Sequence, residues 1–163
     1  GSELGSDVPS CIMSKDLRLN GYGKGIRREK FPKNYYFLII YPHLKLSTKS
    51  VFEHYSNSKN LNNNSQKMFF ENIKIYNSLL VSATTLAPKI NDVLDDLEKI
   101  PKIVAYGMTG SGSTCFGIFK NLKDIPNLRE FSNKYYIWFG QKADYNLNRV
   151  CRSKVLENKF QML

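Results

Sequence analysis

The run YYFLIIY, residues 35–41, most limits what this chain can fold into. A short, uninterrupted apolar run of this kind is typical of a strand that is buried within a sheet, and Pro42 ends it. The run is far shorter than the roughly 20 residues that a membrane-spanning helix needs. We therefore expect a sheet covered by other elements, and no association with a membrane.

The patterns on either side of this strand predict the remaining elements. Apolar residues recur at steps of three and four over 66–83, and again over 88–100, so both segments are expected to be helical. Their order predicts an α+β fold, a ferredoxin-like βαββαβ sandwich with extra helices. The other expected elements are a glycine-rich hairpin or loop over 16–30, a helix starting at Ser47 or Thr48, a loop over 57–64, strands over 103–106, 114–119 and 136–139, and a helix over 122–135 entered through Pro126.

The chain is strongly basic. Its 163 residues carry 24 Lys and Arg against 14 Asp and Glu, a net charge of +10. Such an excess suits an anionic partner: a nucleic acid, a membrane surface or a phosphorylated small molecule. The alternative is simple solubility, or a general enrichment in Lys and Asn such as the segment SNSKNLNNNSQK at 56–67 displays.

The three cysteines, Cys11, Cys115 and Cys151, are far apart in the sequence. An odd number without CxxC spacing argues against a disulfide framework and against a zinc site. The expected setting is a reducing cytoplasm, with no metal ion bound by the chain itself.

The stretch GMTGSGSTCFGIF, residues 107–119, places a glycine-rich loop directly before a strand. Consecutive N–H groups of such a loop can turn inward and hold an anion. No GK[ST] follows, so it is not a Walker loop, and a strand follows where a dinucleotide fingerprint needs a helix. The alternative is a plain glycine-rich connection between strands.

Two further stretches could contribute to a site. In GSDVP, residues 5–9, Gly5 permits a sharp turn, Pro9 favours an extended Val8, and Asp7 would be held on a stiff backbone. This suits a catalytic carboxylate, although such an Asp also serves in turns and caps. In STKSVF, residues 47–52, Phe52 lies one helical turn after Thr48 and could be a core residue or could stack on a planar ligand.

Taken in order, LGSDVP, STKSVF, NSLLVSATTLAP and MTGSGSTCFGIF resemble the C-terminal half of the 4-diphosphocytidyl-2-C-methyl-D-erythritol kinases of the GHMP kinase superfamily. The resemblance covers residues 3–120 well and 121–140 loosely. It implies transfer of the γ-phosphoryl group of ATP, with Mg²⁺, to the 2-hydroxyl of a substrate that carries a cytidine diphosphate group, and it implies no binding of nucleic acid.

The resemblance also implies roles for individual residues. Asp7 matches the catalytic base, which would take the proton from the attacking hydroxyl. Gly5 and Ser6 match positions beside the substrate, Thr48 a position in the cytidine pocket, and Phe52 the aromatic that stacks on cytosine. The third superfamily motif, a loop beside the ATP phosphates, is matched by Gly110, Ser111, Gly112, Ser113 and Thr114.

The family's ATP phosphate loop and catalytic lysine have no counterpart in this sequence. We therefore expect a fragment of a two-domain kinase, inactive alone, whose partner is the missing N-terminal half. Residues 1–30 would be the end of the N-terminal-domain region, 31–140 the GHMP kinase C-terminal domain, and 141–163 a basic tail of unknown role. The alternatives are another GHMP kinase, of homoserine or mevalonate type, and a basic RNA-binding module with a ferredoxin-like fold.

Overall fold

The computed structural model describes residues 8–13, 16–20, 25–31, 34–58, 68–70 and 73–141. These residues fall into two compact units, one ending at Asn34 and the other covering Tyr35–Gln141. Each unit is described by itself below. The predictions for Gly5, Ser6 and Asp7, and for the tail beyond residue 141, concern residues outside the described ones.

The first unit contains a short helix and a hairpin. Helix α1 (Val8–Met13) precedes strands β1 (Leu17–Asn20) and β2 (Gly25–Arg28), which pair antiparallel with Leu17 opposite Arg28. The hairpin expected over 16–30 is therefore present. Arg18 pairs with Glu29 across it, and the hydrogen bond from Arg18 is the main reason that the pKa of Glu29 lies below its usual range.

The extended conformation expected for Val8 is wrong, since α1 starts at this residue. The effect of a proline on the preceding residue is a preference, and here the helix overrides it. Pro9 itself is tolerated because N–H groups in the first turn of a helix have no intrahelical acceptor.

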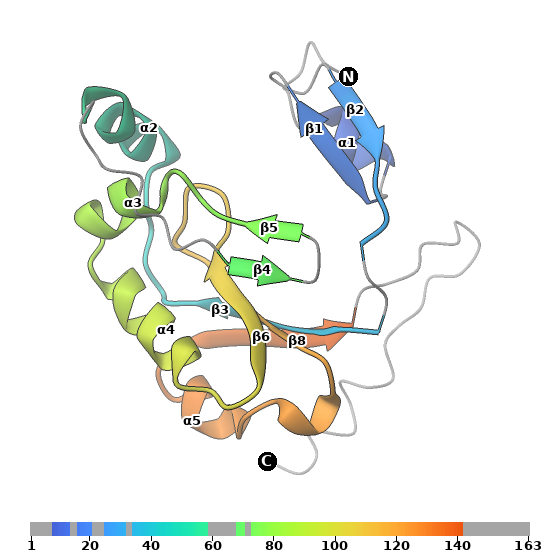
Figure 1. The fold of residues 1–163 in the computed structure, drawn as a ribbon. Coiled ribbons are helices and arrows are strands. Elements are labelled where there is room, and N and C mark those ends of the chain that lie inside the picture. The colour runs from blue at the N-terminus through green and yellow to red at the C-terminus, as the bar shows by residue number, and fades with distance from the viewer. Residues whose placement is uncertain are drawn as a thin grey trace. The chain divides into compact units, whose positions relative to one another are not determined.

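The second unit contains an antiparallel sheet of four strands in the order β6-β7-β3-β8 (Figure 1). These strands are β3 (Tyr36–Tyr41), β6 (Ile103–Met108), β7 (Cys115–Phe119) and β8 (Tyr136–Gln141). With helices between β3 and β6 and between β7 and β8, the connectivity is β-α-β-β-α-β. The ferredoxin-like α+β fold predicted from the sequence is confirmed.

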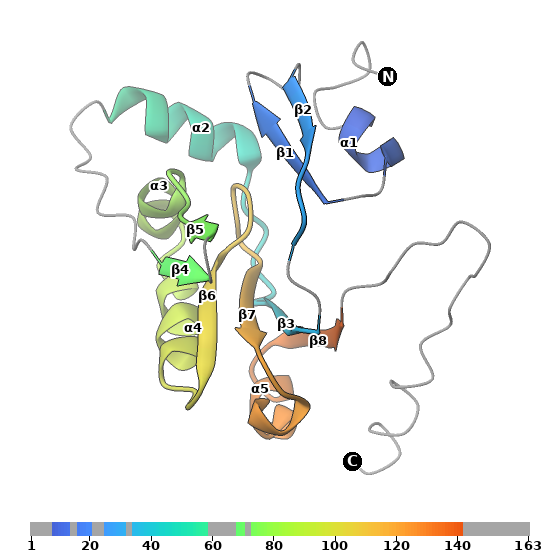
Figure 2. The same cartoon turned by 45° about the vertical axis from the view of Figure 1, so that its right-hand side comes forward.

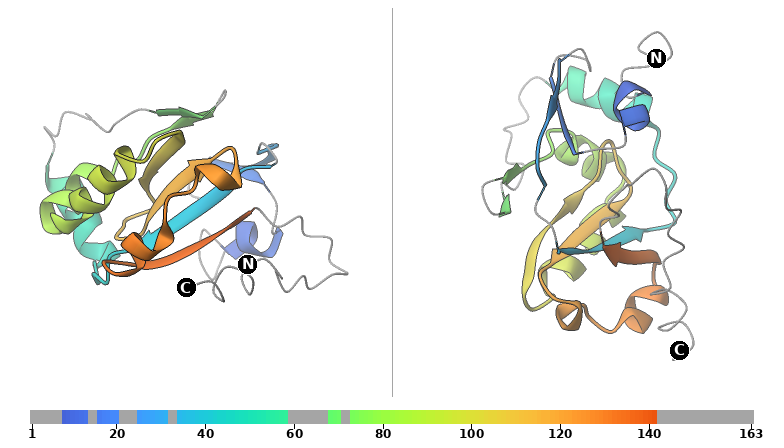
Figure 3. Two further views of the ribbon diagram at one scale, coloured as in Figure 1. Left: turned by 90° about the horizontal axis from the view of Figure 1, so that it is seen from below. Right: turned by 90° about the vertical axis from the view of Figure 1, so that its right-hand side faces the viewer.

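Helices α3 (Leu80–Leu86) and α4 (Lys89–Glu98) lie along one side of this sheet (Figure 3), and α2 (Thr48–Asn57) packs against α3. The apolar stripe predicted for α4 is buried as expected: Ile90, Val93, Leu94 and Leu97 all face the core. Leu38 and Ile40 of the central strand β3 are fully buried in the same cluster. Each such side chain contributes roughly 1.5–3 kcal/mol of burial free energy.

The helix expected over 66–83 is wrong in its first half. Residues Met68–Phe70 and Ile73–Ile75 form a two-stranded hairpin, β4 and β5, and the helix α3 begins only at Leu80. The aromatic and β-branched residues of this segment favour strands. Phe70 is fully buried, and its ring lies edge-on to Tyr35 with the ring centroids 4.6 Å apart. Tertiary packing therefore overrides the helical periodicity.

The helix expected over 122–135 is also wrong in extent. The segment forms a 3-10 turn, η1 (Leu122–Asp124), and a short helix, α5 (Leu128–Ser132). Between them Ile125 is extended, with φ −73° and ψ 130°, because Pro126 disfavours a helical conformation in the residue before it. Asn127 then caps α5 by accepting a hydrogen bond from the Arg129 N–H.

Candidate functional site

The glycine-rich loop connects β6 to β7 as a tight turn, residues 109–114. The Thr109 N–H donates to the Thr114 carbonyl at 2.9 Å and the Gly112 N–H to the Thr109 carbonyl at 2.9 Å. Gly110 and Gly112 have left-handed φ angles of +51° and +89°. Only glycine adopts such angles without steric cost. These two glycines therefore let the chain reverse within six residues.

Gly112 has a second reason to lack a side chain. A Cβ atom built on it would lie 2.8 Å from the Met108 Sδ and 3.3 Å from Leu46 Cδ2, whereas at Gly110 no atom would lie within 4 Å. Gly112 thus lies against the core, and Gly110 is open to solvent. The loop has one buried side and one free side.

Three other segments hold the loop in place. The Ser113 hydroxyl donates to the Leu44 carbonyl, in the connection between β3 and α2. The Asn77 amide, in the turn before α3, donates to the carbonyls of Met108 and Gly110. The Thr48 and Ser111 hydroxyls form a hydrogen bond of 2.9 Å. Figure 2 shows the start of α2 beside this loop.

The free side of the loop presents hydrogen-bond donors. Among the described residues, no partner is found for the backbone N–H groups of Gly110 and Ser111. The Thr109 side chain adds an exposed hydroxyl. Successive N–H groups in a turn with left-handed residues form a concavity that attracts anions. The loop can therefore bind an anionic group such as a phosphate.

Helix α2 starts at the site and presents an aromatic side chain. Ser47 is its N-cap, accepting a hydrogen bond from the Ser50 N–H at 3.3 Å, and Thr48 is its first residue. Val51 is buried, but the Phe52 side chain is 51% exposed. Of the two interpretations of Phe52, the core residue is excluded. An exposed aromatic ring remains available for stacking.

A cavity of about 410 Å³ lies beside the loop. Its lining comes from the turn before α3, from β6 and from β7, and includes Asn77, Tyr106, Gly110 and Phe116. Sequence reasoning did not single out Asn77. Two signals were available: Asn77 opens the stretch NSLLVSATTLAP, and it precedes an apolar helical stretch, where Asn commonly caps a helix.

The predicted site residues thus have different outcomes. The structure brings together Thr48, Ser111 and the rest of the loop Gly110–Thr114, with Phe52 on the same helix as Thr48.

Among the described residues, no group of three His, Cys, Asp or Glu side chains is placed to hold a metal ion. Likewise, no helix in the described part is long and apolar enough to span a bilayer.

Comparison with known proteins gives concordant matches. Residues 57–137 match the family model described as GHMP kinases C terminal. The chain is 35% identical over 136 residues to the 4-diphosphocytidyl-2-C-methyl-D-erythritol kinase of Ehrlichia canis, covering 77% of this chain and 48% of the relative. It is 32% identical over 125 residues to the enzyme of the same name from Ruthia magnifica, covering 76% and 44%. The chain therefore spans about half the length of these relatives.

A solved structure supports the same fold. The crystal structure of a 4-(cytidine 5'-diphospho)-2C-methyl-D-erythritol kinase superposes with a TM-score of 0.68 at 20% sequence identity, covering 87% of this chain and 56% of that chain. Together with the matching family model and relatives, this leads to one assignment. The chain belongs to the GHMP kinase superfamily, as a relative of the 4-diphosphocytidyl-2-C-methyl-D-erythritol kinases.

Proposed function

We propose that this chain is the substrate-binding C-terminal half of a kinase that phosphorylates the 2-hydroxyl of 4-diphosphocytidyl-2-C-methyl-D-erythritol, in non-mevalonate isoprenoid biosynthesis. The observation that carries the proposal is the Thr48–Ser111 hydrogen bond of 2.9 Å. It joins the helix expected to line the cytidine pocket to the loop expected to lie beside the phosphates. In the proposed enzyme, this bond would connect the cytidine side of the substrate site to its phosphate side.

The loop suits the phosphate side of this reaction. Phosphoryl transfer depends mostly on positioning and on stabilising charge, so fixed backbone donors are effective catalytic groups. The N–H groups of Gly110 and Ser111, which have no partner among the described residues, fit this requirement. ATP would bring Mg²⁺ on its own phosphate oxygens. Both substrates are polyanions, which gives the +10 net charge a role.

Phe52 suits the base side. Stacking of a nucleic-acid base on an aromatic ring contributes about 1–3 kcal/mol. Tyr55, also on α2 and 37% exposed, provides a matched control. In the full-length enzyme, Phe52→Ala should raise the KM for the cytidine substrate at least five-fold with little change in the KM for ATP. Equal effects on both KM values, or an equal effect of Tyr55→Ala, would contradict stacking.

Asp7 is the proposed base, on the strength of the GSDVP motif alone. In the full-length enzyme, Asp7→Asn should lower kcat by about 10²–10⁴-fold, the usual contribution of general-base catalysis. The substrate should still bind, because the amide has the size of the carboxyl group. Near-normal turnover by this variant would remove Asp7 from the mechanism.

The 163-residue chain alone should release no ADP in a coupled assay. The family's ATP phosphate loop and lysine, which have no match in this sequence, would have to come from the other half of the enzyme. Turnover by the isolated chain would contradict this proposal. We also propose a cytoplasmic location, which suits the free thiol of Cys115.

A further inference from the structure

Asn77 makes three hydrogen bonds with one side chain. Its Nδ2 group donates to the Met108 carbonyl at 2.9 Å and to the Gly110 carbonyl at 2.8 Å. Its Oδ1 atom accepts from the Leu79 N–H at 3.0 Å, at the start of α3. The side chain therefore uses both amide protons and its carbonyl oxygen, and it connects the end of β6, the glycine loop and a helix.

We propose that Asn77 is a positioning residue for phosphoryl transfer, acting through the glycine loop. This inference rests on the proposed function in so far as it concerns catalysis. The two carbonyls that Asn77 binds flank Thr109, so the amide fixes where the loop leaves β6. The N–H groups of Gly110 and Ser111, which have no partner among the described residues, come next in the loop. The direction in which they point depends on where the loop leaves β6.

The chemistry at this position requires a carboxamide. Two carbonyl oxygens converge on Nδ2, and only a group with two donors on one atom can satisfy both. A carboxylate of the same size would bring its charge against both carbonyl oxygens and repel them. A serine could still accept from the Leu79 N–H, as helix caps do, but its single hydroxyl proton could not serve both carbonyls.

The two hydrogen bonds from the Asn77 amide, called the clamp below, complement the bond between Thr48 and Ser111. That bond restrains the middle of the loop through side chains, whereas Asn77 restrains its beginning through the backbone. Gly110, which lies between these two restraints, has a left-handed φ and no neighbour within 4 Å of a built Cβ. Without Asn77, little besides its own backbone would hold this residue.

The first test measures amide hydrogen exchange by NMR in the 163-residue chain. Asn77→Asp should speed exchange of the Thr109 and Gly112 N–H groups at least ten-fold, since both hydrogen bonds lie within the loop. Exchange of the Val93 N–H, in the buried face of α4, should change less than two-fold. Asn91→Asp, the same chemical change on the exposed surface of α4, is the control.

Asn77→Ser separates the clamp from the helix cap and covers the case in which the Asp variant does not fold. It should preserve exchange at the start of α3 and speed exchange in the loop. Unchanged loop exchange in the Ser variant, or an equal increase in every element, would overturn the proposal.

The second test measures kinetics in the full-length enzyme. Asn77→Ser should lower kcat at least ten-fold and change the KM for the cytidine substrate less than two-fold, because α2 is not altered. A rise in KM with unchanged kcat would overturn the catalytic role. If the proposed function itself fails, the wild-type enzyme shows no turnover of this substrate, while the exchange experiment still decides whether Asn77 positions the loop.

Discussion

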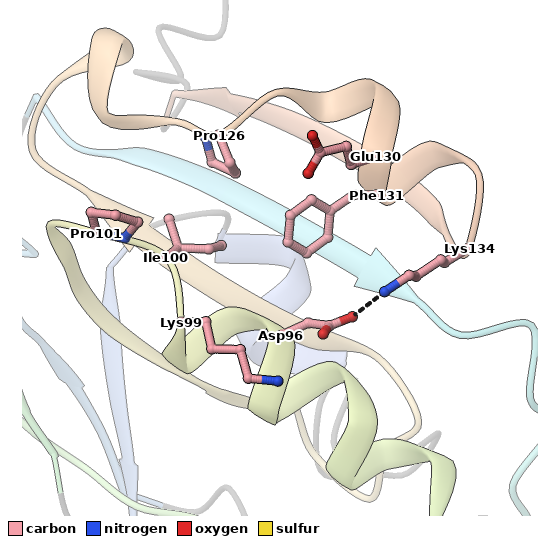
Figure 4. A pocket seen from close by; sticks show the side chains of 8 residues that line it. All are labelled: Asp96, Lys99, Ile100, Pro101, Pro126, Glu130, Phe131 and Lys134. Carbon is pink, nitrogen blue, oxygen red and sulfur yellow. Dashed lines mark hydrogen bonds and ion pairs between the residues drawn. The ribbon is translucent and has the colours of Figure 1, made fainter.

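A pocket lies at each end of β6, and the two pockets differ in chemistry. The cavity of about 410 Å³ lies at the end of the strand, beside the glycine loop, and the described residues that line it include no Asp, Glu, Lys, Arg or His. The cavity of about 270 Å³ at the start of the strand is lined by Asp96, Lys99, Glu130 and Lys134 (Figure 4).

Two of the charged groups at the start of β6, Asp96 and Lys134, pair with each other. Lys134 Nζ lies 3.2 Å from Asp96 Oδ2, and the Tyr135 hydroxyl donates to the same oxygen at 3.0 Å. These contacts connect the region of α5 to α4. At the other end, the N–H groups of Gly110 and Ser111 have no partner among the described residues. The two ends therefore differ: charged side chains pair at the start of the strand, and backbone donors are presented at its end.

The residues with left-handed φ angles also differ between the two ends of β6. At the glycine loop they are Gly110 and Gly112, while at the start of β6 the left-handed residue is Lys102, with a φ of 61°. Lys102 is exposed, and its ammonium group lies 3.5 Å from Asp124. A side chain is therefore tolerated at one turn, whereas at Gly112 it would meet the core.

The largest expected effect is that of Gly112→Ala. The substitution adds strain at φ +89° and places a methyl group 2.8 Å from the buried Met108 sulfur. Backbone strain and overpacking together should cost about 2–4 kcal/mol of unfolding free energy. Urea denaturation measures this loss.

Gly110→Ala is the matched control, because it adds strain without a clash. It should cost about 1 kcal/mol, the usual penalty of a left-handed residue. Equal losses in the two variants would contradict the assignment of a buried and a free side to the loop.

The sequence predicted the ferredoxin-like order of elements well because its strongest signals are local. The run ending at Pro42 and the stripe of α4 each specify one element and one buried face. The glycine loop was placed between its two strands for the same reason. The glycines of the loop indicate a turn, and the apolar residues directly after it indicate a strand.

The errors arose where distant residues decide the outcome. Residues 68–75 have helical spacing, yet Phe70 packs on Tyr35, more than thirty positions away, and the segment is a hairpin. Asn77 was missed because its three partners include carbonyls about thirty residues later. A single sequence does not display such contacts.

The next largest effect is expected at the other end of β6. Asp96→Ala removes the acceptor of both the Lys134 ammonium and the Tyr135 hydroxyl. Because Lys134 is 62% exposed and can turn to solvent, the cost should be only about 1 kcal/mol. The loop amides of Thr109 and Gly112 should exchange as in the wild type. A change in loop exchange would show that the two ends of the strand are coupled.

Tyr135→Phe should alter how stability depends on alkaline pH. Burial, followed by the hydrogen bond to Asp96, raises the pKa of Tyr135 above its usual range. A raised pKa stabilises the fold fully below the unfolded value of about 10, and this contribution is lost as the pH rises above it. Unfolding free energies at pH 8–11 should therefore fall less steeply in the variant.

Part of the alkaline loss should persist in Tyr135→Phe, because burial raises the pKa of the Cys115 thiol to about 12. Cys115 lies at the glycine-loop end of the sheet, whereas the Tyr135 hydroxyl donates to Asp96 of α4. The loss that persists in the variant therefore reports on Cys115, and the loss that disappears reports on Tyr135. Identical slopes in wild type and variant would mean that the Tyr135 phenol ionises as freely in the folded state as in the unfolded state.

The smallest expected effect is that of Lys102→Gly, the reverse of the change at Gly112. Glycine relieves left-handed strain of about 1 kcal/mol, but it increases the entropy of the unfolded chain by a comparable amount. The substitution also removes the pair with Asp124, in which the Lys102 side chain is exposed and which is worth about 0–1 kcal/mol. The net change should be a loss of about 0–1 kcal/mol in urea denaturation, because strain and entropy cancel and only the pair is lost. Lys102→Ala keeps the strain, avoids the entropy cost and loses the pair, so its stability should match that of Lys102→Gly within about 0.5 kcal/mol. A large loss in Lys102→Gly would show that this turn, like the glycine loop, depends on one particular residue.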